Sequence, residues 1–91
     1  MTDKVILKAD FSDGRIVRRE IICEVESIGH KEFFAASQQG FKPEYKLTVW
    51  ADEYQGESTV IYNGETYKVY RTFRRNADRM ELYITRKVGV K

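Results

Sequence analysis

Apolar and polar residues alternate along most of the chain, which is the spacing of strands that bury one face. Near the start, Val5, Leu7 and Ala9 occupy alternate positions. Extended runs of this kind, separated by turn signals, cover 5–11, 16–26, 45–51, 59–62, 66–73 and 80–88. Asn63 and Gly64 predict a tight hairpin between two of these runs, because a type I′ turn needs positive φ at both central residues.

One segment departs from the alternation and predicts a short helix over 30–39. With Gly29 as the N-cap residue, Glu32 falls at the third helical position, from which its side chain can reach back to a free backbone N–H. Ile28 and Phe33 then stand where a hydrophobic staple would place them. The start of this helix is therefore well signalled.

The end of this helix is marked as clearly as its start. Gly40 can take the left-handed conformation that ends a helix, and Phe41 can fold back on Ala36. Pro43 prevents continuation and pushes Lys42 toward extended geometry. The end of the helix is therefore also well signalled.

The runs together predict a mainly β fold, a small antiparallel barrel or sandwich of about six strands with one short inserted helix. The 91 residues suit one domain over 1–91, with no linker, repeat or low-complexity tract. No apolar run approaches the length of a membrane helix, so we expect no membrane association. The first residues lack a signal-peptide pattern and Cys23 is the single cysteine, so we expect the cytoplasm.

A net charge of +2 hides an asymmetry along the chain. Residues 1–65 hold eight Lys/Arg against twelve Asp/Glu, which gives −4, whereas residues 66–91 hold eight against two, which gives +6. The acidic and basic parts can attract each other within the domain or between neighbouring copies in an oligomer.

Candidate catalytic groups are few. Cys23 and His30 could form a nucleophilic pair, but a core cysteine and an exposed histidine explain them better, since no orienting group is evident. Glu24 and Glu26 stand two apart on an outward strand face, which favours a solvated or partner-facing stripe over an acid/base pair. Metal-ligand spacing and a glycine-rich phosphate loop are both missing from the sequence. We expect no enzyme, cofactor or metal site.

Basic and aromatic residues interleave near the C-terminus. They are Lys68, Arg71, Arg74, Arg75 and Arg79 among Tyr67, Tyr70, Phe73 and Tyr83. On a small barrel this mixture can bind single-stranded nucleic acid by stacking and phosphate contacts. Ordinary strand alternation or a protein interface explains it too, and the small net charge favours these readings.

Three further aromatic residues are candidates for contacts outside the barrel core. Trp50 lies opposite the inward face of its strand, where it covers a second core side or anchors a contact with another subunit. Phe33 and Phe34 point about 100° apart on the helix. We expect one of them to pack on the barrel and the other to be covered by something else.

The order of these segments resembles a known family. It runs through CEVESIG, HKEFFAASQQG, KPEYKLTVW, TVIYNGETYKVYRTFRR and ELYITRK. This succession is similar to the head-closure proteins (also called head–tail joining or stopper proteins) of long-tailed phages and prophages, over Val5 to Val88. The most specific parts are 27–36 and the 62–75 hairpin, which are patterns of fold-determining positions rather than active-site signatures.

The resemblance implies a small β-barrel with a helix-bearing loop, assembled as a ring of about twelve subunits below the portal and adaptor rings. Such a ring lines the exit channel of packaged double-stranded DNA without reading its sequence, and it offers a docking surface to tail-terminator proteins. The implied location is the virion neck, after assembly in the bacterial cytoplasm. By position, the channel-facing plug segment is Ile28 to Glu44, with Gly29, His30, Lys31, Gln38, Gln39, Gly40, Lys42 and Pro43 as its candidate residues.

The implied gate must move, whereas the helix is well signalled, so we expect the exit from Gly40 to Glu44 to be the mobile part. The charges of this segment also suit a gate. His30, Lys31 and Lys42 stand against Glu32 and Glu44, which is close to balance and predicts gating by size rather than by phosphate attraction. Candidate residues for protein interfaces are Phe34, Trp50, Tyr70, Arg71, Arg74 and Arg75. The alternatives are a barrel that binds single-stranded nucleic acid, or another neck component such as an adaptor or tail-completion protein.

Overall fold

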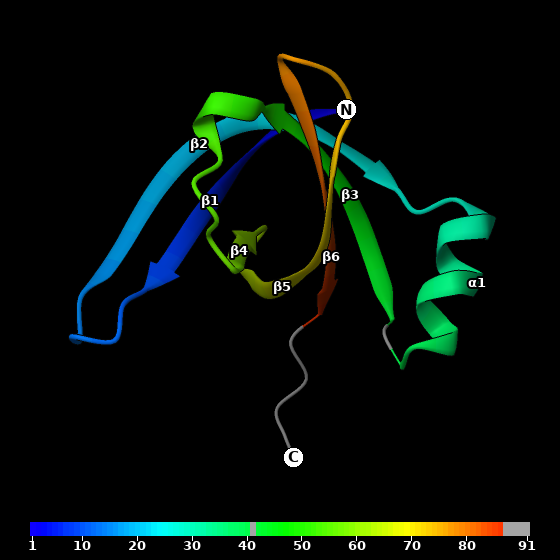
Figure 1. The fold of residues 1–91 in the computed structure, drawn as a ribbon, viewed down its shortest axis with the longest axis horizontal. Helices are drawn as coiled ribbons and strands as arrows, with labels where there is room; N and C mark the ends of the chain where they lie inside the picture. The colour runs from blue at the N-terminus through cyan, green and yellow to red at the C-terminus, as the bar shows by residue number, and fades with distance from the viewer. Residues whose placement is uncertain (41, 87–91) are drawn as a thin grey trace.

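A computed structural model describes residues 1–40 and 42–86, which form a closed antiparallel barrel of six strands with one α-helix, as predicted (Figure 1). The strands are β1 (Thr2–Asp10), β2 (Ile16–Ser27), β3 (Pro43–Trp50), β4 (Thr59–Tyr62), β5 (Glu65–Arg74) and β6 (Arg79–Arg86). The helix is α1 (His30–Gln38), and a 3₁₀ turn, η1 (Ala51–Glu53), follows β3. Around the barrel the order is β1-β2-β3-β6-β5-β4, and β4 closes the barrel onto β1.

The core lies inside this barrel and consists of the alternate residues that the sequence pattern turned inward. It contains Val5, Leu7, Ile21, Cys23, Val25, Leu47, Val49, Val60, Tyr62, Tyr67, Leu82 and Ile84. Leu7, Leu47 and Leu82 are completely buried, and burial of each such side chain contributes about 1.5–3 kcal/mol to folding. The predicted inward faces are therefore confirmed around Leu7, Leu47 and Leu82, whereas Phe11, which continues the alternation of the first run, is 43% exposed.

The hairpin between β4 and β5 turns as predicted. Asn63 and Gly64 have φ values of 54° and 80°, and the flanking residues Tyr62 and Glu65 pair across the strands. Because both central residues have positive φ, the turn has the hand that matches the twist of the two strands. The last predicted strand is found as β6, while Val88 lies outside the described residues.

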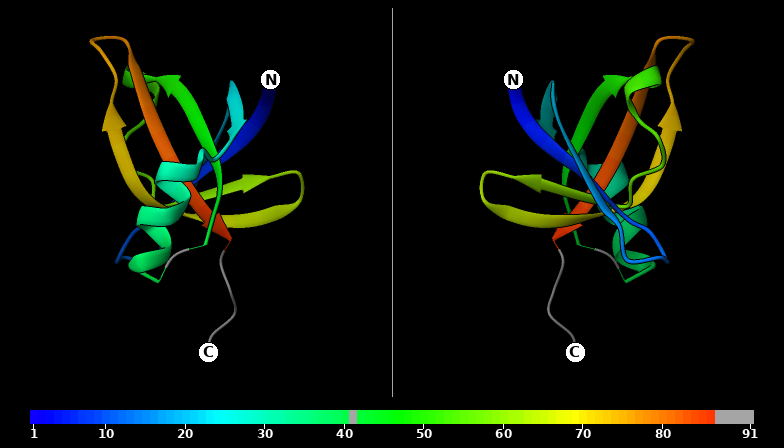
Figure 2. Two further views of the ribbon diagram at one scale, coloured as in Figure 1. Left: turned by 90° about the vertical axis from the view of Figure 1, so that its right-hand side faces the viewer. Right: turned by 90° about the vertical axis from the view of Figure 1, so that its left-hand side faces the viewer.

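Helix α1 begins after the N-cap residue Gly29, as predicted, and lies outside the barrel in the connection from β2 to β3 (Figure 2). Its end is also confirmed, because Gly40 has a φ of +88° and its N–H donates to the carbonyl of Ser37 at 3.1 Å. The expected contact of Phe41 with Ala36 involves a residue outside the described ones. In the part of the chain that the structure describes, no helix is long and apolar enough to cross a bilayer.

Two expectations for this helix are wrong. The Glu32 side chain makes no capping bond to the helix start, because it binds residues of β5 instead. Neither phenylalanine packs closely on the barrel, since Phe33 is 50% and Phe34 66% exposed. The stripe that faces the barrel contains Glu32 and the buried Ala36, one turn apart, and the two phenylalanines lie beside that stripe.

Candidate functional site

The start of the helix-bearing segment is held against the barrel by one carboxylate. Oε2 of Glu32 accepts a hydrogen bond from the Tyr70 hydroxyl at 2.8 Å, and Oε1 accepts one from Nη2 of Arg71 at 2.7 Å. The Glu32 side chain is only 18% exposed. A charge-assisted pair of this kind, strengthened by a phenol donor, ties the first turn of α1 to β5.

An irregularity in β5 makes this contact possible. Successive residues of a strand normally point to opposite faces, so Tyr70 and Arg71 would not reach the same group. The pairing of β5 with β6 shifts register between Val69 and Arg71, so that Tyr70 is an extra residue in its strand. A bulge of this kind re-aims side chains, and here both residues reach Glu32.

The contact continues across the outer face of the sheet. The Arg71 guanidinium lies 4.1 Å from the ring centroid of Tyr83, and the Tyr83 hydroxyl donates to Glu81 at 2.8 Å. Glu81, 6% exposed, also lies 3.8 Å from Nζ of Lys46 and 3.5 Å from Nε of Arg75. Polar groups of β3, β5 and β6, with Arg75 directly after β5, therefore form one connected cluster that reaches the helix through Glu32.

The cluster changes the pKa of its members. Burial acts to raise the pKa of Glu32, but the hydrogen bonds from Arg71 and Tyr70 and the Arg71 charge outweigh it and lower that pKa below the ordinary value. Burial and the hydrogen bond to Glu81 raise the pKa of Tyr83 to about 12. Burial and the bond to Glu32 raise the pKa of Tyr70 as well. Glu32 is therefore ionised and both phenols are protonated at neutral pH.

The cations of the C-terminal hairpin are mostly engaged inside the molecule. Besides Arg71 on Glu32, Nη2 of Arg74 donates to the carbonyl of Ala77 at 3.0 Å. The Arg79 guanidinium stacks 3.4 Å from the ring centroid of Trp50. Charge is offset only where a carboxylate is the partner, at Arg71 with Glu32 and at Arg75 with Glu81.

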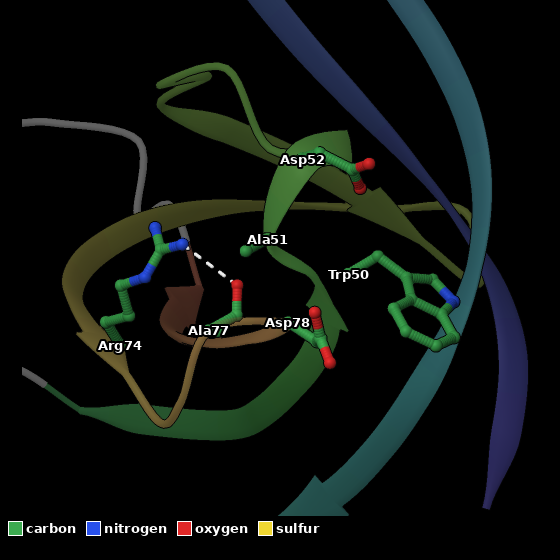
Figure 3. A pocket seen from close by; sticks show the side chains of 6 residues that line it. All are labelled: Trp50, Ala51, Asp52, Arg74, Ala77 and Asp78. Atoms are coloured by element: carbon green, nitrogen blue, oxygen red, sulfur yellow. Dashed lines mark hydrogen bonds between the residues drawn. The ribbon is translucent and has the colours of Figure 1, made fainter.

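Trp50 stays 49% exposed beneath Arg79 and borders a hollow of about 400 Å³ (Figure 3). The hollow is lined by Trp50, Ala51, Asp52, Arg74, Ala77 and Asp78. Figure 3 shows the two aspartates beside the indole and Arg74 on the far side. Two of its lining residues are joined by a 2.7 Å hydrogen bond from the N–H of Ala51 to the carbonyl of Asp78. Trp50 thus keeps surface for a further contact.

Most residues of the predicted plug segment lie at the surface. These exposed residues are Gly29, His30, Lys31, Gln38, Gln39, Gly40 and Lys42. Pro43 is buried at the start of β3, and the carbonyl of Lys42 accepts a hydrogen bond from Oγ1 of Thr85 at 2.6 Å. A second hollow, of about 530 Å³, separates the helix from β3 beside Phe33 and Gly40.

Cys23 and His30 occupy the positions expected of a core cysteine and an exposed histidine. Burial, with smaller contributions from Asp3 and Glu53, raises the pKa of the Cys23 thiol to about 11. Within residues 1–40 and 42–86, no group of three or more His, Cys, Asp or Glu side chains is arranged to hold a metal ion.

Sequence reasoning missed a second ion pair, between Arg19 on β2 and Glu57 in the loop after η1. Nη2 of Arg19 lies 2.6 Å from Oε2 of Glu57, whose side chain is 4% exposed. The other oxygen of Glu57 accepts the backbone N–H of Gln55 at 2.8 Å. A glutamate between Gly56 and Ser58 gives no local signal that a residue far upstream binds it.

The chain matches no family in a scan of protein families, and a search of curated proteins finds no significant match.

Proposed function

We propose that the protein is a head-closure protein of a phage or prophage, which forms a ring in the neck and closes the DNA exit channel with its helix-bearing segment. The proposal rests on the resemblance of the chain to that family. The structural observation that supports it best is a closed barrel whose α-helix is inserted between β2 and β3 and held outside the core by Glu32. The known fold alone is compatible with many functions.

The anchoring of the segment suits an element that meets other subunits. Its start is tied to β5 through Glu32, and its exit is tied to β6 through Thr85 and Lys42. Between these ties Phe33 and Phe34 face solvent. Adjacent exposed aromatic side chains are typical of protein contact sites. We infer that they meet a neighbouring subunit or a partner ring.

The positive and negative charges of residues 28–44 are not equally exposed. Glu32 pairs with Arg71, and Oε1 of Glu44 lies 3.9 Å from Nη2 of Arg86, so both carboxylates are turned toward the barrel. Lys31 and Lys42 are left exposed. A ring would therefore present a modest positive charge along this segment, and its hold on DNA should weaken somewhat with salt.

Reconstitution with portal and adaptor rings tests the proposal. Electron microscopy or native mass spectrometry should show this chain as an added ring, and a protein that never joins the connector would refute the assignment. Phe34→Ser should prevent joining, whereas Phe73→Ser, which removes another exposed aromatic side chain from β5, should not. Both variants keep the barrel core intact, so circular dichroism should show the same fold.

Two alternatives have separate tests. Single-stranded nucleic acid binding is disfavoured by the ion pairs of Arg71 with Glu32 and of Arg75 with Glu81, and oligonucleotide titration at two salt concentrations checks it. Sub-micromolar, salt-steep binding would favour that function over the ring. An adaptor or tail-completion role is separated by gene order, because head closure belongs after the adaptor gene and before the tail-terminator gene.

A further inference from the structure

The first half of β2 has an open edge. Strand β2 pairs with β1 along 16–24, but it pairs with β3 only from Glu24 to Ser27. Among the described residues, 16–23 therefore have a strand neighbour on one side alone. In Figure 1 the start of β2 is the outermost ribbon on its side of the molecule, and η1 crosses the later part of this half in that view, where Arg19 donates a hydrogen bond to the carbonyl of Glu53. Proteins normally cover or block such edges, because the unpaired backbone groups recruit another strand.

The backbone groups on this edge can be identified. The N–H of Phe11 donates to the carbonyl of Arg15 at 2.8 Å, so that pair is hydrogen-bonded within the hairpin. Antiparallel pairs alternate between bonded and non-bonded types. Counting from Phe11 and Arg15, the residues of β2 whose N–H and C=O point away from β1 are Ile16, Arg18, Glu20 and Ile22.

The side chains of these residues also face solvent. Ile16 is 56% and Ile22 59% exposed, which is high for isoleucines in a strand. Arg18 and Glu20 lie between them, are exposed and have no ion pair among the described residues. Along this edge the solvent-facing side chains are therefore, in order, an apolar, a basic, an acidic and an apolar one.

We propose that the free protein forms a two-fold dimer in which the β2 edges of two copies pair antiparallel about Arg19. In this register Ile16 lies opposite Ile22 of the partner, and Arg18 lies opposite Glu20. Each bonded pair then joins residues whose N–H and C=O groups are free. On the inner face, Val17 lies opposite Ile21. Cross-strand pairs of these kinds stabilise a sheet.

The same sequence disfavours other registers. A shift by two residues in one direction places Glu20 opposite Glu20, and in the other direction Arg18 opposite Arg18. Like charges directly opposite each other destabilise a strand pair. A shift by one residue places each outward-pointing residue opposite one whose N–H and C=O are already bonded to β1, so the hydrogen bonds between the two strands cannot form. At the centre the two Arg19 residues face each other, but each is already paired with its own Glu57.

This dimer does not depend on the proposed ring. A two-fold contact uses the same surface on both copies and closes on itself, whereas a ring needs a head-to-tail contact. The dimer is measured on the purified chain, and the ring is measured with portal and adaptor, so one can fail without the other.

Cysteine cross-linking tests the register. In a Cys23→Ala background, Ile16→Cys and Ile22→Cys are made as separate proteins with tags of different size. Bonded antiparallel pairs place Cα atoms about 5.5 Å apart, within the range of a disulfide. Oxidation of the mixture should therefore give a cross-linked heterodimer. Either variant alone should stay uncross-linked, because in its homodimer the cysteines of the two copies lie about 20 Å apart along the paired strands.

Charge exchange gives a second test, read by sedimentation equilibrium. Arg18→Glu and Glu20→Arg should each weaken the dimer by about tenfold or more, since each creates two like-charged pairs. The double variant exchanges the charges and should restore the dimer. A monomeric wild-type chain at all concentrations would overturn the proposal, as would cross-linking of the single variants to the same extent as the mixture. An unrestored double variant would also overturn it, provided that it melts like the wild type.

Discussion

The carboxylate of Glu32 accepts a hydrogen bond from the hydroxyl of Tyr70 at 2.8 Å, although the two residues are 38 positions apart. The local sequence assigns Glu32 to the cap of its own helix. The fold instead offers it a phenol and the Arg71 guanidinium, which are stronger partners than a terminal backbone N–H. Glu32 therefore fixes the helix to the barrel instead of capping the helix N-terminus.

Glu32→Gln should loosen the helix without unfolding the barrel. The substitution removes the charge from a partly exposed pair, so we expect a loss of about 1 kcal/mol in the free energy of unfolding at neutral pH. Native-state hydrogen exchange should show faster exchange in α1 than in the barrel strands. If exchange became equally faster in the strands, the loss of the pair would destabilise the barrel as well as the helix, which would contradict the prediction.

The same pair predicts a pH dependence. Folding lowers the pKa of Glu32, so its contribution is fully present above the ordinary glutamate range and is lost as the pH falls through the lower folded-state value. Urea denaturation at pH 7 and at pH 3 should therefore show a smaller difference for Glu32→Gln than for the wild type. Glu65→Gln, at an exposed position beside the β4–β5 turn, is the matched control and should behave as the wild type.

The barrel could be predicted from sequence because its information is local. Alternation identified the buried faces of Leu7, Leu47 and Leu82, and Asn63 with Gly64 fixed one hairpin. Strand bounds were less certain, since β1 starts at Thr2 and η1 was missed.

The candidate site could be predicted only in part, because its contacts join distant segments. The residues around Tyr70 give no sequence signal for a β-bulge. Without the bulge, the side chains of Tyr70 and Arg71 would point to opposite faces of the sheet. The charge pattern indicated attraction between the acidic and basic parts of the chain, and the pair of Glu32 with Arg71 is one such contact. It could not say which residues pair.

Glu57→Ala should destabilise the protein more than any surface substitution. Glu57 is 3% exposed and binds both Arg19 and the N–H of Gln55, so its removal leaves two donors without their acceptor. We expect a loss of about 2–4 kcal/mol in the free energy of unfolding. Glu24→Ala, at an exposed position on β2, should cost less than about 0.5 kcal/mol.

A double-mutant cycle isolates the pair. Arg19→Ala with Glu57→Ala should lose less stability than the sum of the two single variants, because each single variant already breaks the bond. Strict additivity would show that the two side chains do not interact in solution.

Cys23 should be almost unreactive in the folded protein. The thiol is 4% exposed, and its pKa is raised to about 11, so little thiolate exists at pH 8. A thiol reagent should modify the native chain far more slowly than the chain in urea. Rapid native modification would show that the β2 strand opens around Cys23.

Gly40→Val should impair assembly more than folding. Gly40 has a φ of +88°, which a side chain tolerates poorly, but a Cβ there would meet no atom within 4 Å. The cost is therefore backbone strain alone, about 1–2 kcal/mol. Gly14→Val is the matched control, because Gly14 has a φ of +94° and equally open surroundings in the β1–β2 turn. Both variants should melt at similarly lowered temperatures, and Gly40→Val alone should fail to join the connector. If Gly40→Val unfolds the chain while Gly14→Val does not, the exit of the helix is part of the fold rather than a movable joint.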